Sequence, residues 1–160
     1  MDGAPPRRGL YAPSVMPSLH GLAGADRRGM AGDGDDILIG GKGADVLTGG
    51  RGADFFVIGA LSLVPDTIFD FRPSEGDRLS LGPLIDSLGL RTEPDIDDLV
   101  GATRAGKSIA ITLDTNGTDA RGGIKAVALL FQPEITDPHL LLDHYVTTDP
   151  LVLDHEDYWA

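Results

Sequence analysis

Apolar and polar positions recur every nine residues between Ala31 and Val57. Three successive nonapeptides, at 31–39, 40–48 and 49–57, each pass from a glycine-rich half to a short apolar half. The apolar half alternates as a short strand does, and the glycine-rich half favours a tight turn. Leu38, Leu47 and Phe56 hold the same place in their units. The pattern therefore predicts stacked short strands joined by turns, with these three side chains pointing into a common core.

Each nonapeptide fits the template Gly-Gly-x-Gly-x-Asp-x-apolar-x, and Ala31 is the one departure from it. This template is typical of parallel β-helix repeats, in which two successive units form one coil. Turns on the same side would then stack about 4.8 Å apart. We therefore expect Asp36 to lie next to Asp54. Asp45 would lie next to Asp26 if residues 21–29 form a degenerate first repeat.

The other apolar positions of the repeats face away from the predicted core. Ile37, Ile39, Val46, Phe55 and Val57 would form a surface that is too apolar to remain in water. Residues 59–150 are the segment available to cover it.

The predicted fold class is all-β, a short parallel β-roll packed on a C-terminal β-rich capping domain with one short helix. Residues 1–20 are rich in Pro, Gly and Arg and are predicted to be a disordered arm or linker. The β-roll would span 21–58, with 21–29 as its degenerate repeat. The capping or secretion target region would span 59–150, and 151–160 would be a C-terminal tail.

The region after the repeats contains further short strands. Alternating apolar positions predict strands at 66–71, 77–81, 109–113 and 124–131, and Asp114–Gly117 follows the third of these as a turn. The short apolar segments 84–88 and 96–100 are compatible with single helical turns. Asp137 and Pro138 predict an N-cap and first turn for a short helix through Tyr145.

Composition narrows the possible functions. The chain of 160 residues has 22 glycines, 11 prolines, no cysteine and a formal net charge of -12. The acidic balance argues against nucleic-acid binding, and the lack of cysteine excludes disulfides and thiolate metal sites. No apolar stretch is long enough to span a membrane. Arg7 and Arg8 precede a segment interrupted by prolines, so we expect no cleaved N-terminal signal peptide.

The stacked aspartates predict a metal site. Two carboxylates about 5 Å apart repel each other by roughly 3 kcal/mol at an effective dielectric of 20, and a cation between them removes this cost. Hard oxygen ligands favour Ca²⁺ over Mg²⁺ and over soft transition metals. Asp33 and Asp35 occupy variable positions, where a solvated role and ligation both remain open. The candidate ligands, through carboxylates or turn carbonyls, are Gly32, Asp33, Gly34, Asp36, Gly41, Gly43, Asp45, Gly50, Gly52, Asp54 and Asp26.

The repeats and the motifs after them resemble the repeats-in-toxin (RTX) proteins. The stretch from about 31 to 153 is similar to the C-terminal target region of type I secretion substrates. The motifs that carry this resemblance are Asp66-Thr-Ile-Phe-Asp-Phe71, Gly76-Asp-Arg-Leu-Ser-Leu81 and Leu113-Asp-Thr-Asn-Gly117.

The resemblance implies a secreted protein that stays unfolded in the low-calcium cytosol, passes through an ABC exporter and folds on meeting calcium outside. Extracellular calcium modules bind at roughly 10⁻⁴ to 10⁻³ M, between the two compartments. The terminal Asp157-Tyr-Trp-Ala160 is similar to the family's acidic and hydrophobic ending, and both an exporter signal and a frayed tail remain open for it. The chain would be either a stand-alone target module or a fragment of a longer protein.

Three motifs suggest other chemistry but lack its context. Gly101–Ser108 fits a phosphate-binding loop, yet a strand pattern follows it where a helix is required, so we expect a turn between strands. Asp114–Asp119 lacks the glycine and glutamate positions of an EF-hand, although an additional calcium site there remains an alternative. His20, His139, His144 and His155 lack metalloprotease spacing. We therefore do not expect an enzyme.

Two alternatives to a stand-alone calcium module remain open. The chain could be an accessory or remnant module of a secreted RTX enzyme, such as an alginate epimerase, a metalloprotease or a lipase. It could also belong to an adhesin that self-associates through the open N-terminal end of the roll.

Overall fold

The computed structural model describes residues 12–13, 19–21, 28–90, 96–116 and 123–149. These residues are mostly strands, in two sheets. The first sheet contains, in spatial order, β1 (Ala12–Pro13), β3 (Arg28–Asp33), β5 (Val46–Arg51), β7 (Asp66–Phe69), β11 (Ile124–Phe131), β10 (Ser108–Asp114) and β9 (Val100–Ala105). The second contains β12 (Val146–Thr147), β8 (Arg78–Ser80), β6 (Phe55–Ile58), β4 (Ile37–Gly40) and β2 (Leu19–Gly21).

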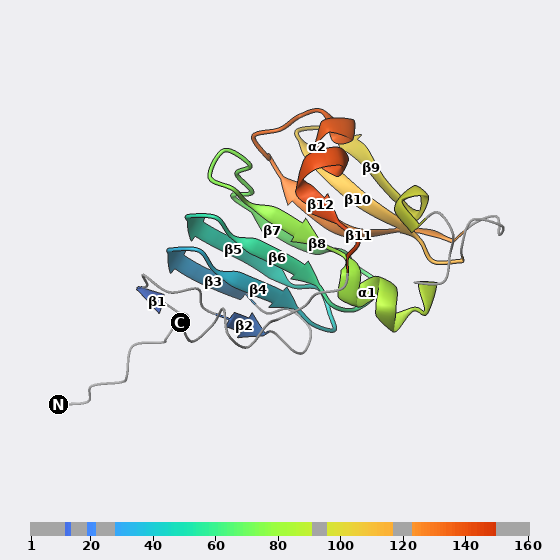
Figure 1. The fold of residues 1–160 in the computed structure, drawn as a ribbon, viewed down its shortest axis with the longest axis horizontal. Coiled ribbons are helices and arrows are strands. Elements are labelled where there is room, and N and C mark those ends of the chain that lie inside the picture. The colour runs from blue at the N-terminus through green and yellow to red at the C-terminus, as the bar shows by residue number, and fades with distance from the viewer. Residues whose placement is uncertain (1–11, 14–18, 22–27, 91–95, 117–122, 150–160) are drawn as a thin grey trace.

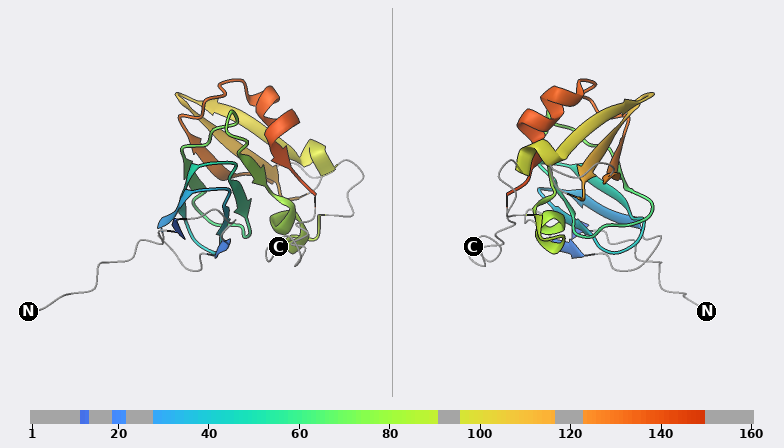
Figure 2. Two further views of the ribbon diagram at one scale, coloured as in Figure 1. Left: turned by 60° about the vertical axis from the view of Figure 1, so that its left-hand side comes forward. Right: turned by 90° about the vertical axis from the view of Figure 1, so that its right-hand side faces the viewer.

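Successive strands of the repeat region alternate between the two sheets. β3, β5 and β7 pair in parallel in the first sheet, and β4, β6 and β8 pair in parallel in the second. The chain therefore runs as a coil that crosses from one sheet to the other at every turn (Figure 1). The two sheets lie face to face as layers (Figure 2).

The interior between the layers is filled by the apolar position of each repeat. Leu38, Leu47 and Phe56 are fully buried, which confirms their predicted inward direction. Leu38 pairs in register with Phe56, and Leu47 pairs with Ile68 of the next coil. Phe56 also packs against Phe71, with ring centroids 5.9 Å apart. The core is thus built from side chains stacked along the coil axis.

The coil continues beyond the nonapeptides. β7 pairs with β5 and β8 pairs with β6, so the strand pairing runs across the predicted boundary at residue 58. β11 and β12 extend the same two sheets further. The glycine pattern stops at Val57, but an aspartate two residues before a core side chain persists at Asp66 and Asp77.

The rest of the chain contains the predicted elements and a further strand, β9. β9, β10 and β11 form antiparallel hairpins. The turn predicted over Gly101–Ser108 is confined to residues 106–107, because Gly101–Ala105 belongs to β9. Helix α1 (Gly82–Ser87) and the 3-10 helix η2 (Ile96–Leu99) occupy the two short apolar segments. Helix α2 (Pro138–Tyr145) has the predicted N-cap, because the Asp137 side chain accepts hydrogen bonds from the backbone N–H groups of His139 and Leu140.

The outward apolar face of the repeats is covered in part. Val57 of β6 is fully buried, and α1 packs against this strand. Ile37, Ile39, Val46 and Phe55 are half-buried. Val57 is therefore shielded from water, whereas the other four positions stay partly exposed.

The N-terminal segment differs from the predicted arm. Ala12–Pro13 pairs in parallel with β3, and Leu19–Gly21 pairs in parallel with β4. The sequence did not predict these pairings because residues 1–20 have no periodic apolar positions. Asp26 and Asp157–Ala160, with the predicted roles of each, lie outside the described residues.

Candidate metal centre

The glycine-rich turns stack directly on one another. Gly50 and Gly52 have φ angles of 112° and 120°, a region that L side chains rarely adopt. A Cβ atom at Gly50 would collide with the carbonyl oxygen of Gly32, and one at Gly52 would collide with that of Gly34. The turns of successive coils therefore pack carbonyl oxygens against glycine Cα atoms, and no larger residue fits.

A ladder of aspartates connects the turns. The backbone N–H of Asp36 donates to Oδ1 of Asp54 at 3.0 Å, and the N–H of Asp54 donates to Oδ1 of Asp77 at 2.9 Å. On the opposite edge the N–H of Asp45 donates to Oδ1 of Asp66 at 2.9 Å. The structure thus places Asp36 beside Asp54, as the repeat predicts. Each carboxylate is held against the coil before it.

Asp66, Asp70 and Asp77 belong to this arrangement, although the sequence analysis assigned them only to strands. The repeat spacing could have revealed Asp66 and Asp77, because each precedes a buried core residue, Ile68 or Leu79, as the aspartate of every nonapeptide does. For Asp45, Asp26 was the predicted neighbour, and the described neighbour is Asp66.

Burial makes several carboxylates of the aspartate ladder costly to ionise. Asp36, Asp45, Asp54, Asp66 and Asp77 are each at most 2% exposed. Desolvation raises the pKa of Asp54 and of Asp66 to about 7, and the pKa of Asp77 to about 6. Desolvation also raises the pKa of Asp70. The coil edges therefore hold several carboxyl groups that a nearby cation would stabilise in their charged form.

Two buried carboxylate oxygens have no hydrogen-bond donor among the described residues. Among the residues that the structure describes, Oδ2 of Asp54 and Oδ2 of Asp66 are buried and accept no hydrogen bond. Oδ2 of Asp66 lies 2.5 Å, and Oδ2 of Asp45 3.7 Å, from the position that a Cβ atom of Gly40 would occupy. Carboxylates of two coils thus converge beside one glycine, and a residue with a side chain would fill the space between them.

The variable aspartates of the first repeat lie at the surface. Asp35 is exposed, and its Oδ1 accepts a hydrogen bond from the backbone N–H of Ala53 at 2.8 Å, which links two coils. Asp33 is exposed and lines a cavity of about 450 Å³ together with Gly32, Gly50 and Asp70. Neither side chain is buried in the aspartate ladder.

The donor set fits a hard divalent cation. Within the described ranges, no group of three or more His, Cys, Asp and Glu side chains is placed to hold a metal ion. Backbone carbonyls must therefore complete any site, and carboxylates with carbonyls are the ligands that Ca²⁺ prefers. Asp36 and Asp54 with the 32–34 turn and Gly52 would hold one ion. The carbonyl of Gly50, also a predicted ligand, accepts a hydrogen bond from Nη1 of Arg72 instead. Asp45 and Asp66 with the 41–43 turn would hold another on the opposite edge.

Stacked glycine turns with buried aspartates define a metal-binding repeat protein, and comparison with known families gives the same result. Residues 30–60 match the family model of the RTX calcium-binding nonapeptide repeat, in four copies. This segment is therefore similar to RTX repeats, and repeats of this family bind Ca²⁺. A search among curated proteins found no match.

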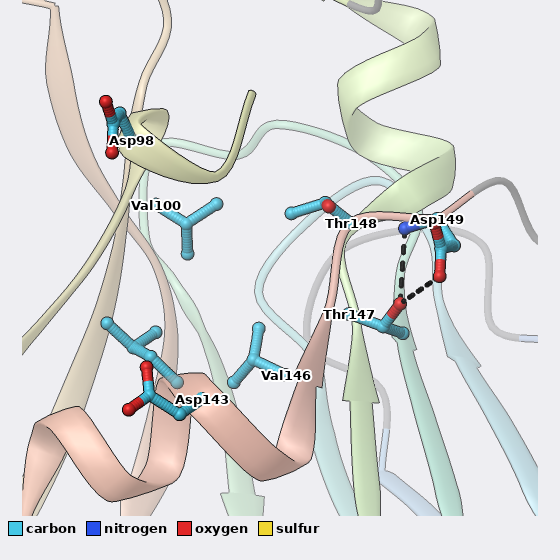
Figure 3. A pocket seen from close by; sticks show the side chains of 8 residues that line it. Asp98, Val100, Asp143, Val146, Thr147, Thr148 and Asp149 are labelled. Atoms are coloured by element: carbon cyan, nitrogen blue, oxygen red, sulfur yellow. Dashed lines mark hydrogen bonds between the residues drawn. The ribbon is translucent and has the colours of Figure 1, made fainter. Parts of the chain in front are cut away.

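A second acidic region lies away from the coils. A cavity of about 640 Å³ is lined by Asp98, Asp143 and Asp149, near η2, α2 and β12 (Figure 3). All three carboxylates are exposed. Asp149 exchanges hydrogen bonds with Thr147, whose Oγ1 donates to Oδ2 at 3.3 Å and accepts from the backbone N–H at 3.2 Å. These water-accessible groups lack the burial that distinguishes the aspartate ladder.

The other sequence motifs stay apart from the metal centre. The Oδ1 of Asp114 accepts a hydrogen bond from the backbone N–H of Asn116, which makes a turn at the end of β10. His139 and His144 belong to α2, whereas His155 lies outside the described residues. No helix in the described part of the chain has the length and apolar character needed to cross a membrane.

Proposed function

We propose that residues 28–80 form a calcium-dependent β-roll whose folding is triggered by extracellular calcium after type I secretion. The observation that carries this proposal is the pair of buried Oδ2 atoms, on Asp54 and Asp66, that accept no hydrogen bond. A folded coil without a cation would have to keep these carboxyl groups protonated or bury their charge.

The energetics couple binding to folding. Bringing the carboxylates together removes them from water, and their raised pKa values express that cost. The calcium site does not exist in the unfolded chain, so the free energy of binding becomes free energy of folding. A dissociation constant for calcium of roughly 10⁻⁴ to 10⁻³ M would keep the coil unfolded in the cytosol and allow it to fold outside the cell.

In this proposal the described residues bind calcium and fold, and no catalysis is assigned to them. The family match at residues 30–60 supports a role as a secreted RTX module. Passage through an ABC exporter fits a chain that remains unfolded until it meets calcium. The β9–β11 strands and α2 would cap the C-terminal end of the roll, because β11 pairs with β7 and β12 pairs with β8.

A calcium titration of the full chain, followed by circular dichroism, tests the proposal. We expect the β signal to rise with calcium and to remain low with the same concentrations of magnesium. Asp36→Asn and Asp54→Asn should each raise the calcium midpoint by roughly tenfold or more, since even losses outside the ligand shell cost 10–100-fold in metal affinity.

The matched control is Asp143→Asn, which makes the same chemical change at an exposed position on α2. It should keep the midpoint of the parent chain. A β signal that does not respond to a chelator, or equal midpoints for Asp54→Asn and Asp143→Asn, would show the proposal to be wrong.

A further inference from the structure

Two turns of the coil stack on the 49–54 turn, one from each side. The 31–36 turn precedes it, and the 70–77 turn follows it. The aspartate ladder runs through both contacts, because Asp36 donates to Asp54 and Asp54 donates to Asp77. By the ladder alone, the two gaps between these turns would be equivalent calcium sites.

The carboxylates of the second gap differ in their hydrogen bonds. Oδ1 of Asp77 accepts from Asp54, and its Oδ2 accepts from the backbone N–H of Arg72 at 2.7 Å. The two oxygens of Asp70 accept from the N–H groups of Gly49 and Gly50 at 3.1 and 3.0 Å. Both oxygens of each carboxylate are therefore satisfied by backbone donors, whereas Oδ2 of Asp54 in the first gap accepts no hydrogen bond.

A side-chain cation is already present in the second gap. The Nη1 atom of Arg72 donates to the carbonyl oxygen of Gly50 at 2.8 Å. Gly50 holds the same place in its repeat as Gly32 does in the first, and the Gly32 carbonyl is one of the predicted calcium ligands. The guanidinium thus donates a hydrogen bond to a carbonyl oxygen equivalent to one that calcium is predicted to bind.

The acidic surroundings match a cation at this position. The Arg72 Nη1 atom lies 3.5 Å from Oε1 of Glu75, whose Oε2 accepts from the N–H of Gly52 at 3.0 Å. Asp70 and Asp77 come from the same turn. Three carboxylates of the 70–77 turn therefore surround the 49–54 turn, and Arg72 supplies positive charge among them.

We propose that the guanidinium of Arg72 takes the place of a calcium ion between the 49–54 and 70–77 turns. The site at Asp36 and Asp54 would then be the last calcium site on this edge of the coil. The inference rests on the proposed calcium-dependent β-roll. Arginine keeps its charge at every physiological pH and is part of the chain, so this gap needs no calcium ion of its own when the coil folds.

The number of calcium ions bound by the full chain tests this assignment. Calcium per chain is measured at saturation by equilibrium dialysis with atomic spectroscopy, for the parent and for Arg72→Gln, Arg72→Lys and Arg51→Gln. Arg51 is the matched control, since it is an exposed arginine of the adjoining turn. We expect Arg72→Gln to bind one more ion than the parent, because the Gly50 carbonyl and Oε1 of Glu75 both lose their cationic partner. Arg72→Lys and Arg51→Gln should bind the parental number.

An unchanged number of ions in folded Arg72→Gln would overturn the inference. If Arg72→Gln does not fold at saturating calcium, Arg72→Lys decides. If the lysine variant folds and binds the parental number of calcium ions, positive charge is what the gap requires, and the inference is supported. If the lysine variant also fails to fold, the shape of the guanidinium matters instead, and the inference is overturned. A parent chain that binds no calcium would contradict the proposed function itself, a result distinct from these.

Discussion

The stacked coils and the β9–β11 hairpins stabilise the same pair of sheets by different means. Each coil strand contributes few core side chains, and the coil edges bury five aspartates, Asp36, Asp45, Asp54, Asp66 and Asp77. The hairpin region has strands of six to eight residues and buries Ile109, Ile111, Leu113, Val127 and Leu130, with Ser108 as its buried polar side chain. The stability of the coils should therefore depend on cations and pH, whereas that of the hairpins should depend mainly on apolar burial.

Removal of calcium should produce the largest difference in stability between the two regions. At a calcium concentration 100 times the dissociation constant, each ion contributes about 2.7 kcal/mol, so two ions contribute about 5 kcal/mol. On chelation at pH 7.5 we expect the amides of residues 28–80 to lose protection from hydrogen exchange. The backbone amides that hydrogen-bond β10 to β11 should lose less protection, since those strands pair with each other. Mass spectrometry of peptic peptides measures both.

Magnesium in place of calcium is the control for ionic strength and should restore little protection. Equal loss of protection in the coils and in β10 would mean that the two regions unfold as one unit, and the comparison would fail.

Two glycine substitutions, one in a turn of each region, compare how much stability depends on the close packing of that turn. Gly50→Ala should destabilise the calcium-bound chain by about 3 kcal/mol or more, because φ is 112° and the new Cβ meets the Gly32 carbonyl oxygen. Gly106→Ala, in the β9–β10 turn, should cost only about 1 kcal/mol, since φ is 65° and no atom lies within 4 Å of the new Cβ. Urea denaturation at saturating calcium measures both, and equal losses would contradict tight stacking of the turns.

Acid should stabilise the calcium-free coils. The pKa values of Asp54 and Asp66 rise from 3.8 to about 7 in the fold, so the folded chain binds more protons than the unfolded chain between these values. This contribution is fully present below pH 3.8 and is lost as pH rises through about 7. In a chelator, each of these two carboxyl groups should contribute roughly 2.5 kcal/mol more stability at pH 5 than at pH 7.5. Circular dichroism of the calcium-free chain, followed from pH 7.5 to pH 5, should show a gain of β signal.

With calcium present the pH dependence should reverse, because acid protons compete with the ion for the same carboxylates. Asp66→Asn should weaken both effects, since an amide does not titrate. If calcium-free stability instead rises with pH over this range, the buried carboxyl groups are not the groups that control it.

The smallest effect is expected at the N-cap of α2. Asp137→Ala removes the acceptor for the backbone N–H groups of His139 and Leu140 and should cost about 1 kcal/mol. The calcium midpoint should change little in a titration followed by circular dichroism, because α2 packs mainly on β9 and β12 rather than on the repeat strands. A midpoint shift as large as that of Asp54→Asn would show that the two regions are tightly coupled.

Much of the repeat region could be predicted from spacing alone. The template fixed the phase of each unit, so the inward direction of Leu38, Leu47 and Phe56 and the proximity of Asp36 to Asp54 followed from counting residues. The strand at 124–131 and the helix through Tyr145 were also recognisable, because alternation and a capping aspartate are local signals.

The continuation of the coil was harder to predict because its spacing changes. Asp36 and Asp54 are 18 residues apart, but Asp45 and Asp66 are separated by 21 and Asp54 and Asp77 by 23. The longer loops have lost the glycine template that marks a turn. Asp66 and Asp77 therefore looked like members of another region, although they continue the ladder.

The sequence by itself determined the coil, its inward core and a preference for a hard cation, since each follows from a repeated local pattern. The tertiary structure decided which elements extend that coil: β7 and β8 stack on the repeats, β11 and β12 extend the two sheets, and Arg72 reaches the Gly50 carbonyl. These contacts join residues that no local period relates. They form because unsatisfied strand edges and turn carbonyls at the end of the repeats require hydrogen-bond partners, and only the folded chain brings those partners near.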